Sequence, residues 1–183
     1  MKAAFIRETG TPDNIQFGEL PDPAALAGQV VVQVGAVSVN PIDTYIRGGA
    51  NYWQLPQPYI IGSDLAGTVV SVGPGVTEFR EGDRVWGSNQ GLMGRQGCFA
   101  ELVAVDAKWL YPTPEKISDD EAAASALVGI TAHLGLISRA HLMAGETVFV
   151  AGVAGKDGSG AGVVTGAGAS CVTVSTTLVD SFC

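Results

Sequence analysis

The residues best suited to chemistry lie in the stretch VNPIDTYIRGG, which spans positions 39–49. It brings an amide, a carboxylate and a phenol close together in the chain, at Asn40, Asp43 and Tyr45. A phenol is neutral at pH 7 and can donate a hydrogen bond to a carbonyl oxygen that gains negative charge. Because helix ends do not need an aromatic residue, Tyr45 is the residue that local folding explains least. The stretch therefore predicts a site that stabilises a developing oxyanion.

Local folding accounts for much of the same stretch. Asn40 is a favoured helix N-cap, and Pro41 suits the first helical position. Asp43 then falls at the third position, where a carboxylate interacts with the positive end of the helix. Arg47 and Gly48 likewise suit a helix C-terminus. These residues predict a short helix whether or not it carries a function.

Metal ligands are scarce. A catalytic zinc needs three protein ligands and an open position. The two histidines, His133 and His141, fall in a predicted helical region without a nearby cysteine. Cys98, Cys171 and Cys183 are too widely spaced for a disulfide framework or a metal knuckle. The sequence therefore predicts no metal site.

Composition narrows the function classes. With 183 residues, 46% hydrophobic and 15% charged, the chain has the size of one domain and a further piece. A net charge of -8 with only ten scattered Lys and Arg disfavours a nucleic-acid partner. The apolar run after Met1 is too short for a signal peptide, and no later stretch reaches the ~18 apolar residues of a membrane span. We expect a cytoplasmic protein without a membrane partner.

Short strands must position the candidate residues. Up to about residue 111, turns rich in Gly, Pro and Asp separate short apolar runs, a pattern typical of all-β structure. The candidate strands are residues 2–6, 15–19, 29–37, 65–72, 83–86 and 100–105.

The pattern changes from strand to helix at Ser118. Ser118 and Glu121 have the spacing of a capping box before an Ala-rich helix, and a second helical stretch covers residues 130–141. A buried strand at 147–150, a Gly-rich loop and a strand at 171–176 then indicate the opening of a βαβ unit. The helix expected between them, over residues 159–169, is poor because each of its glycines costs roughly 1 kcal/mol relative to alanine.

Several stretches resemble, in one order, the zinc-free medium-chain dehydrogenases/reductases of the NADPH:quinone oxidoreductase (zeta-crystallin) family. Besides VNPIDTYIRGG they are PYIIGSDLAG at 58–67, FREGDRV at 79–85, GCFAE at 97–101 and GITA at 129–132. Together they cover about residues 1–150. Asn40 and Pro41 stand where the zinc-dependent alcohol dehydrogenases carry a ligand cysteine, and GSD at 62–64 replaces their Gly-His-Glu.

The resemblance implies a mainly β GroES-like domain over residues 1–125. The incomplete start of an α/β Rossmann domain would follow over residues 126–183. It also implies NADPH as cofactor, a small quinone or conjugated carbonyl as substrate, and homodimers among full-length relatives. Because the chain stops at residue 183, we expect a truncated form with impaired activity. A non-catalytic GroES-like binding module or a non-functional fragment remains the alternative.

By this resemblance, Asn40, Asp43 and Tyr45 are catalytic and line the nicotinamide and substrate cleft. Thr131, in GITA, would hold the nicotinamide amide, the alternative being a helix hydroxyl bonded to its own backbone. Tyr52 and Trp53 either form an apolar wall for a flat quinone or belong to the core.

The resemblance extends to the phosphate-binding loop. Gly152, Gly155 and Gly158 keep the spacing of the family, which would let backbone amides approach a pyrophosphate. Lys156 and Asp157 depart from the small or apolar residues expected there. The end of the following strand has no acidic residue for the ribose hydroxyls, which favours NADPH over NADH.

Two further features lie near the centre of the chain. The polar loop 88–96 is a candidate for substrate specificity. Cys98 occupies a position where the family tolerates various residues, so we expect it to serve packing.

Overall fold

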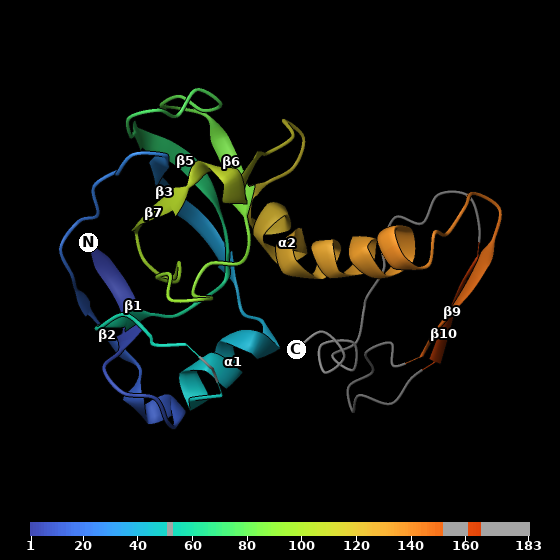
Figure 1. The fold of residues 1–183 in the computed structure, drawn as a ribbon, viewed down its shortest axis with the longest axis horizontal. Helices are drawn as coiled ribbons and strands as arrows, with labels where there is room; N and C mark the ends of the chain where they lie inside the picture. Colours follow the sequence, from blue (N-terminus) through green and yellow to red (C-terminus); the bar gives the residue numbers. More distant parts are fainter. Residues whose placement is uncertain (51–52, 152–160, 166–183) are drawn as a thin grey trace. The chain divides into compact units, whose positions relative to one another are not determined.

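A computed structural model describes residues 1–50, 53–151 and 161–165 of the chain. Contacts divide the chain into two compact units, Met1–Leu127 and Val128–Cys183. The first unit contains α1 and most of the β-structure (Figure 1). The expected domain boundary at residues 125 and 126 stays a prediction.

Two antiparallel sheets build the first unit. The larger has five strands in the order β7-β3-β5-β6-β8, and these are Leu102–Asp106, Gln29–Ser38, Asp64–Val72, Arg84–Gly87 and Leu110–Pro112. The smaller has the order β2-β1-β4, and its strands are Gln16–Glu19, Lys2–Ile6 and Tyr59–Ile60. The strands predicted from the sequence are thereby confirmed, within one or two residues at their ends. β4 and β8 were not expected.

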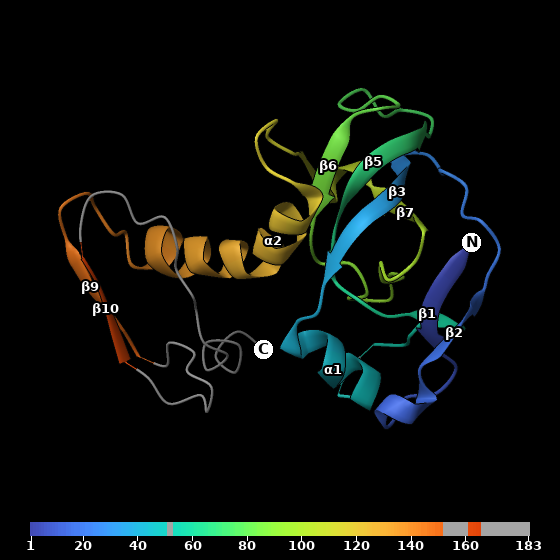
Figure 2. The same ribbon diagram turned by 180° about the vertical axis from the view of Figure 1, so that it is seen from behind.

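The core of the larger sheet is built mainly from branched aliphatic side chains, which suit strands. Its buried cluster consists of Val30, Val32, Leu65, Val69, Val85, Cys98, Val103, Val105 and Leu110. Cys98 is fully buried within it, which agrees with a packing role. β3 and β5 run side by side (Figure 2), and their register sets Ser38 opposite Asp64. This pairing brings the end of β3 to the beginning of β5.

α1 is an eight-residue helix, Pro41–Gly48, that follows β3 closely. Asn40 is its N-cap, and the helix ends at Gly49 in the left-handed conformation (φ 96°) that glycine adopts readily. Ile46 is fully buried in a cluster with Ile6 and Tyr59, among others. The short helix predicted from the sequence is therefore confirmed, and one face of it is anchored in the core.

α2, Asp119–His133, begins at the predicted capping box. Both the backbone N–H and the hydroxyl of Ser118 donate to Glu121 Oε2 at 2.9 Å, and the Glu121 N–H donates to Ser118 Oγ at 3.2 Å. Ala122 and Ala123 pack against Ala66 of β5, where small side chains allow a close approach. A π-helical turn, Leu134–Arg139, continues α2. The two predicted helical stretches therefore form one run.

This helical run has the length and apolarity of a membrane span. Asp119–Arg139 contains 21 residues, and its most apolar window has a mean hydropathy of 1.3 and is 17% buried. It is the one helix of this kind in the part of the chain that the structure describes. The similarity rests on length and composition alone, which core helices of soluble proteins share, so the absence of a membrane partner stays a prediction.

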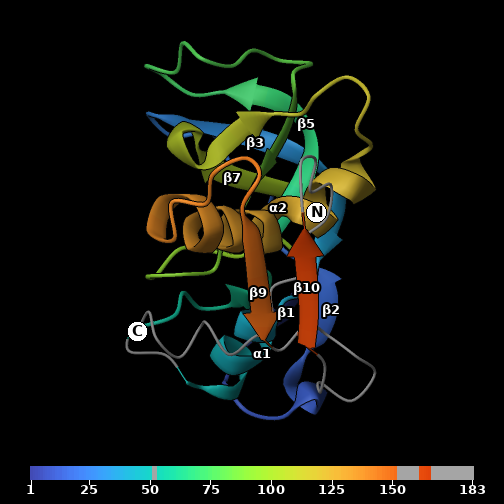
Figure 3. The same cartoon turned by 90° about the vertical axis from the view of Figure 1, so that its right-hand side faces the viewer.

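The second unit contains an antiparallel strand pair. β9, Thr147–Ala151, pairs with β10, Ala161–Thr165 (Figure 3). β9 confirms the strand predicted at 147–150. The helix predicted over 159–169 is wrong for residues 161–165, because adjacent valines favour a strand and the glycines weaken a helix. The strand predicted at 171–176 lies outside the described residues.

Candidate functional site

Two buried carboxylates meet where α1 and β5 begin. The side chain of Asp43 on α1 is 5% exposed, and that of Asp64, the first residue of β5, is 1% exposed. Burying a charged carboxylate is costly unless hydrogen bonds compensate for the lost water. Both side chains are therefore expected to have several partners.

Asp43 is bound on both of its carboxylate oxygens. The Ser63 hydroxyl donates to Oδ1, and the Asn40 backbone N–H donates to Oδ2 at 2.8 Å. Burial raises the pKa of Asp43 above its ordinary value, and the negative charge of Asp64 adds to this, although the hydrogen bonds from Ser63 and Asn40 act in the opposite direction. Asp43 therefore holds a proton at a higher pH than an exposed aspartate does.

Asp64 accepts hydrogen bonds from four segments of the chain. Asn40 Nδ2 and Ser38 Oγ donate to Oδ2 at 2.8 and 2.9 Å. Ser88 Oγ donates to Oδ1 at 2.5 Å, and the backbone N–H of Leu127 on α2 donates to Oδ2 at 3.1 Å. This carboxylate thus joins β3, the start of α1, the residue after β6, and α2.

Tyr45 is on the outer face of α1. Its side chain is 50% exposed, whereas the neighbouring Ile46 is completely buried. The far end of the helix is held by Arg47, whose Nη1 donates to the Gly10 carbonyl and whose own carbonyl accepts the Gly10 N–H at 2.9 Å. α1 is therefore held at both ends and presents a phenol to solvent.

The remaining predicted residues are not part of this cluster. Thr131 is half-buried near the end of α2. Trp53 packs against the apolar cluster around Ile46, which supports its reading as a core residue. Tyr52 lies outside the described residues, as do Gly152, Gly155 and Gly158, so the structure does not bear on their predicted roles.

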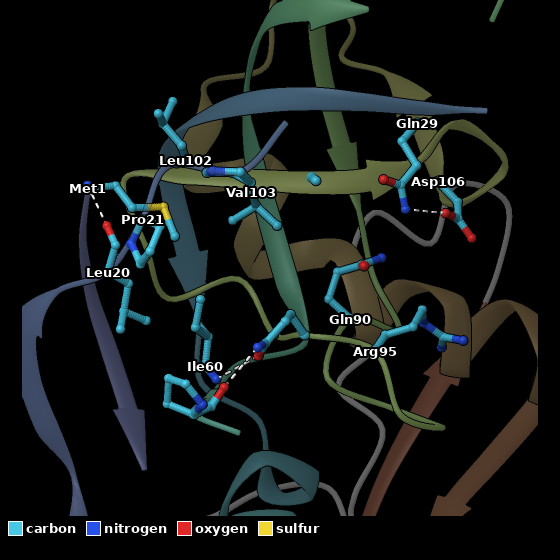
Figure 4. A pocket seen from close by; sticks show the side chains of 15 residues that line it. Met1, Leu20, Pro21, Gln29, Ile60, Gln90, Arg95, Leu102, Val103 and Asp106 are labelled. Atoms are coloured by element: carbon cyan, nitrogen blue, oxygen red, sulfur yellow. Dashed lines mark hydrogen bonds between the residues drawn. The ribbon is translucent and has the colours of Figure 1, made fainter. Parts of the chain in front are cut away.

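The polar loop 88–96 borders a cavity of about 380 Å³ (Figure 4). Gln90 and Arg95 line this cavity, but Asn40, Asp43 and Tyr45 do not. Much of the polarity of the loop is used within the first unit: Arg95 donates to the Asn89 carbonyl at 2.6 Å, and its guanidinium lies 4.8 Å from the centre of the Trp109 ring. The cavity is therefore separate from Asn40, Asp43 and Tyr45, although Ser88, the first residue of the loop, donates to Asp64.

No group of three or more His, Cys, Asp or Glu in the described part of the chain is arranged to hold a metal ion. Ser63, which stands where zinc-dependent relatives carry a histidine, instead donates its hydroxyl to Asp43.

The sequence did not predict the roles of Ser38, Ser63, Asp64 and Ser88. One signal was present, because Ser63 and Asp64 are adjacent polar residues at the start of a mainly apolar strand. Their partners, however, are distant in sequence, which no local pattern reveals.

The comparisons with known proteins agree with this architecture. Residues 26–115 match the alcohol dehydrogenase GroES-like domain family. The chain is 35% identical over 159 residues to the quinone oxidoreductase of Pongo abelii. The matched region covers 86% of this chain and 47% of that relative. Over this length, the chain is similar to the quinone oxidoreductases.

Solved structures of the medium-chain dehydrogenase/reductase type give the same result. An alcohol dehydrogenase superfamily protein from Novosphingobium aromaticivorans is 42% identical with a TM-score of 0.72, over 80% of this chain and 44% of that one. The Escherichia coli quinone oxidoreductase complexed with NADPH is 32% identical with a TM-score of 0.68, over 76% and 41%.

These likenesses confirm the expected fold class, a mainly β GroES-like domain followed by the start of a Rossmann domain. The chain spans about half the length of the quinone oxidoreductases it matches.

Proposed function

We propose that this chain serves the reduction of a quinone or a conjugated carbonyl beside α1, with NADPH as reductant and without a metal. The quinone oxidoreductase relatives and the NADPH complex of the Escherichia coli enzyme support the reaction class. The observation that carries the proposal is the exposed Tyr45 phenol on a helix whose first turn is held by a buried hydrogen-bond network.

Each side chain of the cluster has a distinct part in this reaction. NADPH, when bound, supplies the hydride. The Tyr45 hydroxyl donates a hydrogen bond to the substrate oxygen as that oxygen gains negative charge. Asn40 Nδ2 donates to Asp64, and the part that we propose for Asn40 in the reaction is to hold the start of α1. Asp43, whose pKa is raised by burial, accepts hydrogen bonds from Ser63 and from the Asn40 backbone and so holds the helix start.

The described residues fit NADPH only in part. Thr131 on α2 could hold the carboxamide, and the three glycines of the loop lie outside the described residues. β10, however, lies within the stretch 159–169 in which a phosphate-binding helix is expected. We therefore expect weaker NADPH binding and slower turnover than a complete phosphate-binding helix would give.

β10 favours a second candidate function. Without the phosphate-binding helix, the first unit would bind a quinone beside α1 and not reduce it.

We propose a cytoplasmic location for both candidates, which agrees with the buried, free thiol of Cys98. Pairing of two chains stays a prediction.

NADPH absorbance, followed in the presence of a small quinone, tests the function. Tyr45→Phe is expected to lower kcat by roughly tenfold to a hundredfold, because it removes one donor to the oxyanion. Tyr111→Phe is the matched control, since Tyr111 is also 50% exposed but stacks on Trp86. Equal turnover by both variants would contradict the role of Tyr45. Saturable quinone binding without NADPH oxidation would select the second candidate.

A further inference from the structure

We propose that Asp64 is the positioning residue of this site: its carboxylate fixes Asn40 at the start of α1 and thereby the place of the Tyr45 phenol. The catalytic consequence rests on the proposed function, whereas the structural consequence does not.

The first step is the orientation of the Asn40 side chain. Asp64 is almost fully buried, and Asn40 Nδ2 donates to its Oδ2 at 2.8 Å. The same oxygen also accepts from Ser38 and Leu127, so the groups that surround it are donors. A flipped Asn40 amide would turn its oxygen toward the carboxylate, losing this bond and adding repulsion. Asp64 therefore selects one orientation of Asn40.

The second step leads from Asn40 to Tyr45. Asn40 caps α1, and its backbone N–H is held by Asp43 of the same first turn. An eight-residue helix has little stability of its own, because helices this short are marginal in water. Its direction is therefore set by its attachments, and a change at Asn40 is passed on to the exposed Tyr45.

The third step concerns α2. The oxygen that accepts the Asn40 amide also accepts the backbone N–H of Leu127. Leu127 is the last residue of the first unit. One carboxylate oxygen therefore holds both the start of α1 and the part of α2 that belongs to the first unit.

Steady-state kinetics of Asp64→Asn test the catalytic consequence. We expect kcat to fall roughly tenfold or more, because the buried hydrogen bonds that hold Asn40 are disturbed, while the KM for quinone changes by less than about threefold. Asp106→Asn is the matched control: Asp106 accepts a side-chain amide of Gln29 at 2.9 Å but lies on β7, and kcat should be unchanged.

A double-mutant cycle separates positioning from general loosening of the fold. If Asp64 acts through Tyr45, Asp64→Asn should lower kcat little further in the Tyr45→Phe background. Equal losses in both backgrounds would overturn the proposal, as would a loss in Asp106→Asn that matches that of Asp64→Asn. If Asp64→Asn does not fold, Asn40→Ser replaces it, because serine still caps a helix but is too short to keep the amide contact.

An NMR measurement on the full chain decides the structural part without any turnover. The side-chain amide protons of Asn40 should exchange with solvent roughly a hundredfold more slowly than those of the partly exposed Asn14, whose amide makes only long hydrogen bonds of 3.4 Å. Asp64→Asn should remove that protection and shift the ring resonances of Tyr45, and Asp106→Asn should do neither. Exchange as fast as that of Asn14, or unshifted Tyr45 resonances, would overturn the proposal. A wild-type chain that does not oxidise NADPH would refute the proposed function. The NMR result would still test the structural role of Asp64.

Discussion

At the scale of single residues, Asp43 and Asp64 have the same chemistry but different surroundings. Asp64 accepts hydrogen bonds from three side chains and one backbone amide. Asp43 accepts one from Ser63 and one from the Asn40 backbone, and burial raises its pKa. The raised pKa of Asp43 should therefore make stability depend on pH.

The pH dependence of stability tests the state of Asp43. Because the folded pKa of Asp43 lies above its ordinary value of 3.8, the native chain binds this proton more tightly than the unfolded chain does. The resulting stabilisation is complete below the ordinary pKa and is lost as pH rises through the folded one. In urea titrations, the free energy of unfolding of the wild type relative to Asp43→Asn should therefore fall as pH rises above 3.8.

Glu121→Gln is the control of opposite sign. Hydrogen bonds from the backbone and side chain of Ser118 hold the pKa of Glu121 below its ordinary value of 4.5. The stability of the wild type relative to Glu121→Gln should accordingly rise with pH over the range just below 4.5. The same trend for Asp43→Asn would show that the pKa of Asp43 is not raised.

Cys98 should be inert in the folded chain. Its thiol is completely buried and donates to the Asp64 carbonyl at 3.1 Å, and burial raises the pKa of this thiol well above its ordinary value. Since the thiolate is the reactive form, iodoacetamide should label Cys98 in urea but not in native buffer. Mass spectrometry of the peptide that contains Cys98 measures this. Rapid labelling of the native chain would contradict the packing described for it.

At the scale of elements, the sequence predicted most accurately those strands and helices that one local signal determines. The strand at Lys2–Ile6 and the capped helices after Asn40 and Ser118 follow from alternation and capping residues. β4 and β8 are two and three residues long, and each forms by pairing with a neighbouring strand. Such pairing leaves no local pattern, and for the same reason the residues that meet at Asp64 were not predicted.

Gly62, just before β5, is sensitive to substitution for two reasons. It has φ +101°, and a Cβ there would overlap the Phe99 ring. Gly62→Ala should lower the free energy of unfolding by about 2–4 kcal/mol, from left-handed strain and overpacking together. Gly75→Ala shares the strain, with φ +84° but open space around it, and should cost only about 1 kcal/mol. Urea denaturation measures the free energy of unfolding of both variants. Equal losses would mean that the Phe99 ring moves aside without cost.

At the scale of the whole molecule, the ordered motifs predicted a GroES-like domain and the start of a Rossmann domain, which the family matches confirm. Residues 161–165 were the exception, because the family resemblance implied a helix where the local sequence favours a strand. The residues of the proposed site differ in the same way in what the structure describes. Its α1 cluster belongs to the first unit, whereas the loop glycines lie outside the described residues.

The first unit should fold without the rest of the chain. Every cluster of buried apolar side chains in the described part of the chain lies within residues 1–127. A shortened chain that ends with α2 at His133 should therefore unfold in one cooperative step, with a melting midpoint within about 5 °C of that of the full chain. Circular dichroism measures the transition. A gradual change without a midpoint would show that the second unit is needed.

The hydrogen bonds to Asp64 have a consequence for the order of folding. Their donors are 24 to 63 residues away from Asp64 in the chain. Closing such long loops costs entropy before any contact compensates for it, so these bonds are expected to form after the transition state. In stopped-flow experiments, Asp64→Asn should thus accelerate unfolding and leave the refolding rate nearly unchanged. Asp64, the proposed positioning residue, would then also slow unfolding and so prolong the lifetime of the native state.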